Sequence, residues 1–133
     1  SAIANIAVDS KYWLWINGKI AVFEGGLKRG PNRTDTYYDE IDLKPFLKAG
    51  DNTIAVLVWF WGKDGFSHKN SGKGGFLFQA DIDSMRVVSD ATWRVRAHTG
   101  YVAQTDPGPN FRLPEWNVQF DAAATYGVDG ARL

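Results

Sequence analysis

The stretch NTIAVLVWFWGKDGFSHKNSGKGGFLF, from Asn52 to Phe78, decides the fold. It opens with seven apolar residues in succession, Ile54 to Phe60, which predict a β-strand buried on both faces or enclosed in a core. A polar loop of fourteen residues, Gly62 to Gly75, follows, and a second apolar strand begins at Phe76. Long loops inside compact domains are commonly functional. We therefore expect this loop, with Trp61 at its root, to form part of a ligand-binding rim.

A β-hairpin is predicted directly upstream of this stretch. The run KYWLWI ends at Ile16, and KIAVF begins at Lys19 after the dipeptide Asn17-Gly18. Two β-rich runs joined by Asn-Gly favour a type I′ turn, because both central residues need a positive φ. Alternation divides the first run into two faces. We expect Tyr12, Leu14 and Ile16 to face the core, and Trp13 and Trp15 to face outward.

The rest of the chain contains short alternating runs separated by turn residues. They predict further strands at residues 2–8, 37–41, 76–82, 85–88, 93–96 and 116–120. Pro45 can begin a single helical turn, with Leu43 as a core plug and Gly50 as a left-handed stop. Many short strands with almost no helix are typical of an antiparallel β-sandwich or jelly roll. We expect an all-β fold with one domain, residues 1–133.

Composition excludes several classes of function. The 15 basic and 15 acidic residues balance, so the chain lacks the basic excess of a nucleic-acid or anionic-membrane binder. Cysteine is absent, which excludes disulfides and thiolate zinc sites. The chain begins SAIANIAVDS, without an initiator Met or a signal-peptide pattern. We therefore expect it to be excised from a larger multidomain protein.

Catalytic patterns are poorly supported. Asp64, Ser67 and His68 lie together in the long loop, but groups so close in sequence rarely adopt triad geometry. Paired carboxylates could hydrolyse glycosides if correctly spaced, and the candidates are Asp35, Asp39, Glu40, Asp106 and Glu115. A chain of this length rarely encloses such a cleft, so a small hydrolase is the weakest hypothesis.

Calcium is a candidate cofactor, although no pattern fixes its site. The oxygen ligands that Ca²⁺ prefers occur in turn-rich loops and on one expected strand face. The candidates are Asp64, Asn70, Asp81, Asp83, Asp106 and Asn110. Solvated acids are the simpler interpretation, and zinc is disfavoured because the two histidines lie thirty residues apart.

Carbohydrate binding fits the loops best. A sugar presents an apolar C–H face and a ring of hydroxyls, so its site needs an aromatic plane flanked by polar groups. Six Trp residues exceed what a sandwich core of this size requires. Two loops combine these residue types, and the predicted carbohydrate-binding residues are Trp61, Asp64, His68, Asn70, Asn110, Arg112, Glu115 and Trp116.

Four segments occur in an order found in a known family. They are WLWINGKIAVFEGG, IDLKPFLKAGDNTIAVLVWFWG, SDATWRV and NFRLPEWNVQFDA. Their order and spacing resemble the N-terminal β-sandwich of bacterial α-L-rhamnosidases and, more distantly, the sugar-binding sandwich of family-two glycosidases. The resemblance implies a galactose-binding-like jelly roll without catalytic residues of its own, joined to a separate catalytic domain in a secreted, periplasmic or cell-surface bacterial enzyme.

The resemblance leaves two roles open. Some relatives of this domain bind rhamnose with the help of calcium, and others brace the catalytic domain. The sequence therefore predicts a carbohydrate-binding accessory module of a glycoside hydrolase, with a rhamnose-containing glycan as a candidate ligand. The alternative is a ligand-free module whose aromatic residues pack on the catalytic domain of the same polypeptide.

Overall fold

The computed structural model describes residues 1–27, 32–65, 68–102 and 118–124. Within these ranges the regular secondary structure consists of β-strands and one 3-10 turn. The elements are β1 (Ala2–Asp9), β2 (Lys11–Ile16), β3 (Lys19–Gly26), β4 (Asp39–Asp42), η1 (Lys44–Phe46), β5 (Ile54–Trp59), β6 (Gly75–Ile82), β7 (Met85–Val88), β8 (Tyr101–Val102) and β9 (Gln119–Phe120).

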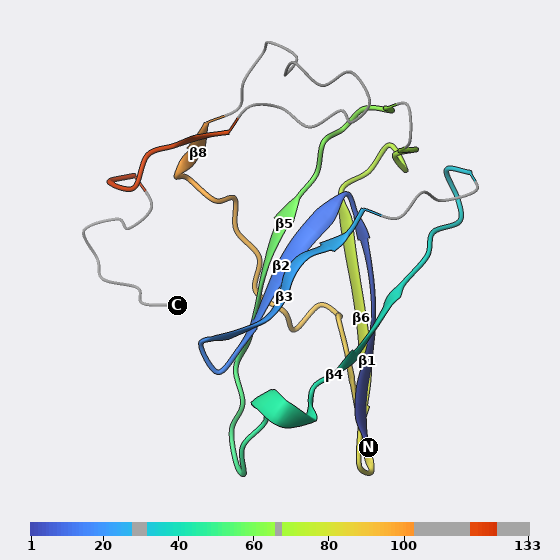
Figure 1. Ribbon diagram of the computed structural model, residues 1–133, viewed down its shortest axis with the longest axis vertical. Coiled ribbons are helices and arrows are strands. Elements are labelled where there is room, and N and C mark those ends of the chain that lie inside the picture. Colours follow the sequence, from blue (N-terminus) through green and yellow to red (C-terminus); the bar gives the residue numbers. More distant parts are fainter. Residues whose placement is uncertain (28–31, 66–67, 103–117, 125–133) are drawn as a thin grey trace.

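The strands form an all-β antiparallel sandwich, as predicted. One sheet has the order β4-β1-β6-β7, the second has the order β3-β2-β5, and β8 pairs with β9. All of these pairings are antiparallel. In Figure 1 the long strands of the two larger sheets run beside each other, and β1 leads directly into β2 where the chain passes from one sheet to the other.

The core lies between the two larger sheets and is supplied by alternate residues of their strands. The side chains at alternate positions in β1 and β2 are buried, which is the pattern of strands that pack on one face. Full burial of one such aliphatic side chain stabilises the fold by about 1.5–3 kcal/mol. The core cluster contains Ala2, Ala4, Ile6, Tyr12, Leu14, Ile16, Leu43, Phe78 and Ala80. The predicted inward face of the hairpin is therefore confirmed.

The predicted turn chemistry is also confirmed. Asn17 and Gly18 have φ values of 52° and 77°, as a type I′ turn requires. The side chain of Asn17 donates to the backbone oxygen of Phe46 at 3.0 Å, which ties the hairpin to η1. Leu43 precedes this turn and is fully buried, and Gly50 has a φ of 81°.

The prediction that the apolar run from Ile54 to Phe60 is buried on both faces was wrong. Within the described residues β5 pairs with β2 alone, at the edge of the three-stranded sheet. Val58 and Phe60 are 36% and 37% exposed. The run is apolar throughout because Ile54 and Val56 pack against the core, while the alternate residues share the opposite face with the hairpin tryptophans.

Of two further strand predictions, one was wrong and one lies partly outside the described residues. Residues 93–96 form no strand, because Trp93 turns back onto the core and packs against Phe76 and Phe78 at ring-centroid distances of 6.0 and 5.5 Å. Its indole nitrogen donates to the backbone oxygen of Val88 at 3.0 Å. Of the strand predicted at 116–120, the described part is the two-residue β9.

Candidate functional site

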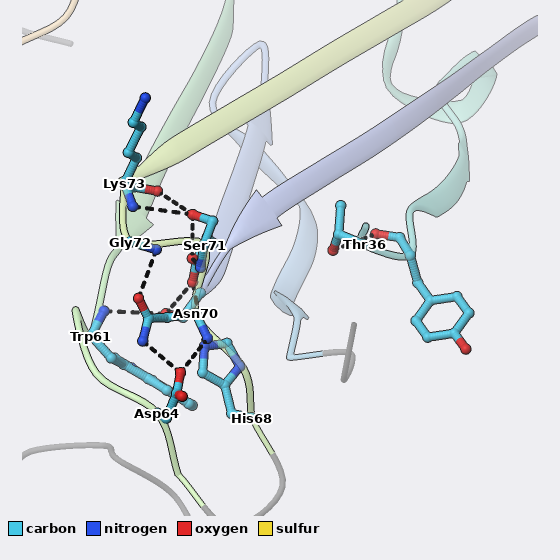
Figure 2. A network of polar contacts seen from close by, with 11 residues as sticks. Thr36, Trp61, Asp64, His68, Asn70, Ser71, Gly72 and Lys73 are labelled. Atoms are coloured by element: carbon cyan, nitrogen blue, oxygen red, sulfur yellow. Dashed lines mark hydrogen bonds and ion pairs between the residues drawn. The ribbon is translucent and has the colours of Figure 1, made fainter. Parts of the chain in front are cut away.

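The loop between β5 and β6 is organised around the carboxylate of Asp64. One of its oxygens accepts the backbone N–H of Asn70 at 3.0 Å and the side-chain amide of Asn70 at 2.7 Å. The amide oxygen of Asn70 in turn accepts the N–H of Gly72 at 2.7 Å. Figure 2 shows this network close to where β1 ends and β6 begins. The polar residues of the loop therefore hold its own backbone in shape.

The electrostatics around Asp64 favour its ionised form. The backbone hydrogen bond from Asn70 is the main cause, and the ammonium of Lys69, 3.1 Å away, adds to it. Together they lower the pKa of Asp64 to about 2. An Arg33 guanidinium nitrogen lies 3.6 Å from the same carboxylate. Asp64 thus draws two cations towards the rim of the loop.

The end of β1 is the anchor of the loop. Asp9 accepts the backbone N–H of Ser71 at 2.6 Å and its hydroxyl at 2.8 Å, both on Oδ2. Its other oxygen accepts the hydroxyl of Ser10 at 2.9 Å and lies 3.3 Å from Nε2 of His68. Asp9 therefore accepts hydrogen bonds on both of its oxygens and lies against His68.

Trp61 is buried, which corrects its predicted role as an exposed aromatic platform. The residue is 5% exposed, because His68 covers its ring edge to face at a centroid distance of 5.0 Å. Its backbone N–H donates to the hydroxyl of Ser10 at 3.1 Å. The indole Nε1 of Trp61 and both ring nitrogens of His68 are buried without hydrogen-bond partners among the described residues, although Nε2 lies near Asp9. In this conformation Trp61 offers no face on which a sugar could stack.

A hollow of about 160 Å³ opens between this loop and the segment that precedes β4. Its polar lining comes from both sides and from the end of β1. Its floor is formed by aliphatic residues of β1 and β6, with Leu77 66% exposed. The residues that line it include Asp9, Arg33, Asp35, His68, Lys69 and Leu77. Figure 2 shows Thr36, another lining residue, across from the loop.

The predicted binding residues divide into three groups. Asp64, Asn70 and Trp61 belong to the framework of the loop, and His68 lines the hollow. The other four predicted residues, Asn110, Arg112, Glu115 and Trp116, lie outside the described residues. The structure therefore brings the first four into one loop and does not test the second cluster.

Sequence reasoning missed Asp9 and Arg33 as site residues. Asp9 ends an ordinary strand, and only the pairing of β1 with β6 places it beside Ser71. Arg33 lies in a glycine-rich and proline-containing segment that reads as a surface loop. Nothing in the local sequence relates this segment to the loop Gly62 to Gly75.

The hollow has the groups that polar recognition of a ligand requires. Arg33 and Lys69 are donors, Asp35 is an acceptor, and the aliphatic floor suits C–H groups. Its described lining contains no Phe, Tyr or Trp side chain, and the imidazole of His68 is turned against Trp61. The triad hypothesis for the loop is not supported, because Asp64 is bonded to Asn70 and Lys69 while His68 lies against Asp9.

The acidic residues that were candidate metal ligands do not form a cluster among the described residues. In the ranges that the structure describes, no three His, Asp or Glu side chains gather in a way that could hold a metal ion. Asp81 is paired with Arg86, with 2.7 Å between carboxylate oxygen and guanidinium nitrogen, and Asp83 lies in the turn after β6. The expectation that Asp81 and Asp83 share a strand face is therefore wrong.

Among the described residues, no helix has the length and apolarity to span a bilayer.

The fold and the hollow define a β-sandwich module, and comparison with known proteins relates it to glycoside hydrolases. The crystal structure of a GH78 family rhamnosidase from Bacillus sp. GL1 superposes with a TM-score of 0.63 and 26% identity, covering 75% of this chain and 10% of that one. A β-galactosidase of Yersinia enterocolitica is 41% identical over 54 residues, which are 41% of this chain and 4% of that enzyme. No protein-family model matches the chain.

The chain is thus a glycoside-hydrolase-related domain. It spans about a tenth of the rhamnosidase and a smaller part of the β-galactosidase. The similarity extends to one module of each enzyme, and the activities of the complete enzymes belong to proteins many times longer.

Proposed function

We propose that this chain is a non-catalytic accessory module of a secreted or cell-surface bacterial glycoside hydrolase, corresponding to the N-terminal sandwich of rhamnosidases, and that it binds carbohydrate. The observation that carries the proposal is the hollow at the end of β1. It combines hydrogen-bond donors and acceptors with an aliphatic floor, which is the mixture that a hydroxylated ring requires.

The size of the hollow supports a small ligand. At about 160 Å³ it is smaller than the roughly 300–1,000 Å³ of pockets for drug-sized ligands, so it suits a single sugar unit. Such a contact without aromatic stacking is weak, on the order of µM to mM, or about 4 to 8 kcal/mol. Weak binding of this kind keeps an enzyme near its polysaccharide without trapping it there.

Bracing of a neighbouring domain is the second candidate, and a different surface supports it. The outer face of the β3-β2-β5 sheet carries Trp13, Leu57 and Trp59, all partly exposed, beside Phe23, which is 72% exposed. An antiparallel sheet ordinarily has one polar face, so an apolar outer face suits contact with protein. The partner would be the catalytic domain of the same polypeptide.

A glycan array separates the two candidates. The 133-residue chain is applied with calcium and with a chelator, including rhamnose-containing glycans. We expect reproducible binding to at least one glycan class, and we expect Arg33→Ala to abolish it without unfolding the protein. If no glycan is retained in either condition, the bracing role takes precedence. Turnover of an aryl glycoside by this chain would overturn both candidates.

A further inference from the structure

We propose that the hollow selects an uncharged sugar ring over an acidic sugar, with Arg33 as the donor and Asp35 as the acceptor for its hydroxyls. This inference rests on the proposed carbohydrate binding and adds the class of ligand. It follows from the charges around the hollow and from how much hydrogen-bonding capacity each lining group retains.

The charges that line the hollow cancel. Asp9 and Asp35 supply two negative charges, and Arg33 and Lys69 supply two positive charges. Asp64, just outside the lining, lies 3.6 Å from Arg33 and 3.1 Å from Lys69 and adds a third carboxylate. A carboxylate on the ligand would meet cations that already have a counter-charge, together with like charges that repel it. A ring without charge avoids this repulsion.

The lining groups with unused hydrogen-bonding capacity are those of Asp35 and Arg33. Both oxygens of Asp9 already accept hydrogen bonds, Oδ2 from Ser71 and Oδ1 from the hydroxyl of Ser10. Asp35 accepts the amide of Asn32 at 2.6 Å through Oδ2, which leaves Oδ1 without a hydrogen-bond partner among the described residues.

Arg33 likewise has N–H donors that make no ordinary hydrogen bond to a described residue. Its guanidinium has five N–H donors, and its one ion pair with a described residue is longer than an ordinary hydrogen bond. A sugar hydroxyl both donates and accepts, so neighbouring hydroxyls can satisfy Asp35 and Arg33 together. A carboxylate can only accept, so at the position next to Asp35 it offers no donor where a hydroxyl would.

The floor of the hollow agrees with this assignment. Ala7 and Leu77, which pair across β1 and β6, contribute aliphatic surface, and Leu77 is 66% exposed. Contact with the C–H face of a ring would remove this surface from water, which favours binding. A neutral ring uses both the floor and the polar rim.

Calorimetric titration of the 133-residue chain tests the assignment at pH 8, where histidine is ordinarily neutral. The panel pairs neutral hexoses with their uronic acids: glucose with glucuronate, and galactose with galacturonate. We expect at least one neutral sugar to bind about tenfold more tightly than its uronic acid. Asp35→Asn should weaken the neutral sugar and reduce the discrimination, whereas Arg33→Ala should abolish binding of both. Arg94→Ala and Asp51→Asn, exposed and outside the hollow, are matched controls.

The outcomes separate the two proposals. A uronic acid that binds as tightly as its neutral partner, or more tightly, would overturn the selectivity and leave carbohydrate binding intact. If no sugar of either class binds, both proposals fail. Equal losses in the Asp35 and Asp51 variants would show that the effect is not local, and would also overturn the role assigned to Asp35.

Discussion

Ser71 donates two hydrogen bonds to one carboxylate oxygen of Asp9, although the two residues are 62 positions apart in the sequence. The N–H and the hydroxyl of Ser71 lie 2.6 and 2.8 Å from Oδ2 of Asp9. This contact fastens the β5–β6 loop to the end of β1, and His68 lies against the other oxygen. The shape of the hollow therefore depends on Asp9.

Asp9→Asn should loosen the loop. The amide replaces an acceptor by a donor or by a weaker acceptor opposite Ser71, so we expect a loss of about 1–3 kcal/mol in the free energy of unfolding. Hydrogen exchange at residues 68–73 should accelerate more than exchange in β2. Asp51→Asn is the control, because Asp51 is exposed. Unchanged stability and exchange in Asp9→Asn would show that the clamp is not structural.

Acid should weaken the loop through Asp64. The pKa of this carboxyl is lowered to about 2 in the folded chain, from an ordinary value of 3.8. Because the folded pKa is the lower one, its contribution is complete above pH 4 and disappears as the pH falls towards 2. Chemical unfolding measured between pH 5 and pH 2 should show a smaller decline for Asp64→Asn than for the wild type. Parallel declines in the two proteins would contradict this assignment.

Trp61→Ala should destabilise the whole domain and not only a binding surface. The side chain is buried, and removal of a buried aromatic ring costs about 3–5 kcal/mol. Trp61→Phe should cost less, since it preserves much of the ring and removes an indole N–H that has no described partner. Thermal unfolding of both variants provides the measurement. If Trp61→Ala abolished sugar binding while unfolding normally, an exposed platform role would be restored.

Tyr12→Phe should remove one link between the two sheets. The hydroxyl of Tyr12 donates to Oδ2 of Asp39 at 3.1 Å, and the same oxygen accepts the N–H of Gly26 at 2.8 Å. We expect a loss of about 1–3 kcal/mol in unfolding free energy, with Tyr37→Phe, at an exposed position, as the control. An equal effect of the two substitutions would contradict the link.

The ionisation of Tyr12 predicts alkaline behaviour as well. The pKa of this phenol is raised above its ordinary value of 10.0, mainly because the side chain is buried and further because the charge of Asp39 lies nearby. The unfolded chain then loses the proton first, so stability is complete below pH 10 and declines as the pH rises beyond it. Tyr12→Phe should flatten this decline. A decline of the same slope in the variant would assign it to other groups.

Local signals in the sequence predicted much of the fold. The Asn17-Gly18 turn and the alternation of Tyr12, Leu14 and Ile16 depend on neighbouring residues alone, and all were confirmed. The position of β5 at a sheet edge depends on which strands pair with it. An uninterrupted apolar run does not indicate which strands these are. The contact of Trp93 with Phe78 is likewise a tertiary contact, so the alternation around Trp93 predicts a strand that does not form.

The candidate site was predictable only in part, for the same reason. The length and composition of the loop with Asp64, His68 and Asn70 indicated a functional segment, and Asp64 and Asn70 do contact each other. The residues that complete the hollow come from the end of β1 and from residues 32–36, which only the folded sheet brings near. The burial of Trp61 also depends on a partner, His68, seven residues further along.

The central claim is that the hollow at the end of β1 binds sugar, and a titration followed by ¹⁵N NMR tests it most directly. Neutral hexoses added to the 133-residue chain should shift the amide signals of residues 32–36, 68–71 and Leu77, with saturation in the µM to mM range. The signals of the β2–β3 turn at Asn17 and Gly18 should not move. Absence of saturable shifts with every sugar, or saturable shifts confined to the outer face of the β3-β2-β5 sheet, would contradict the account.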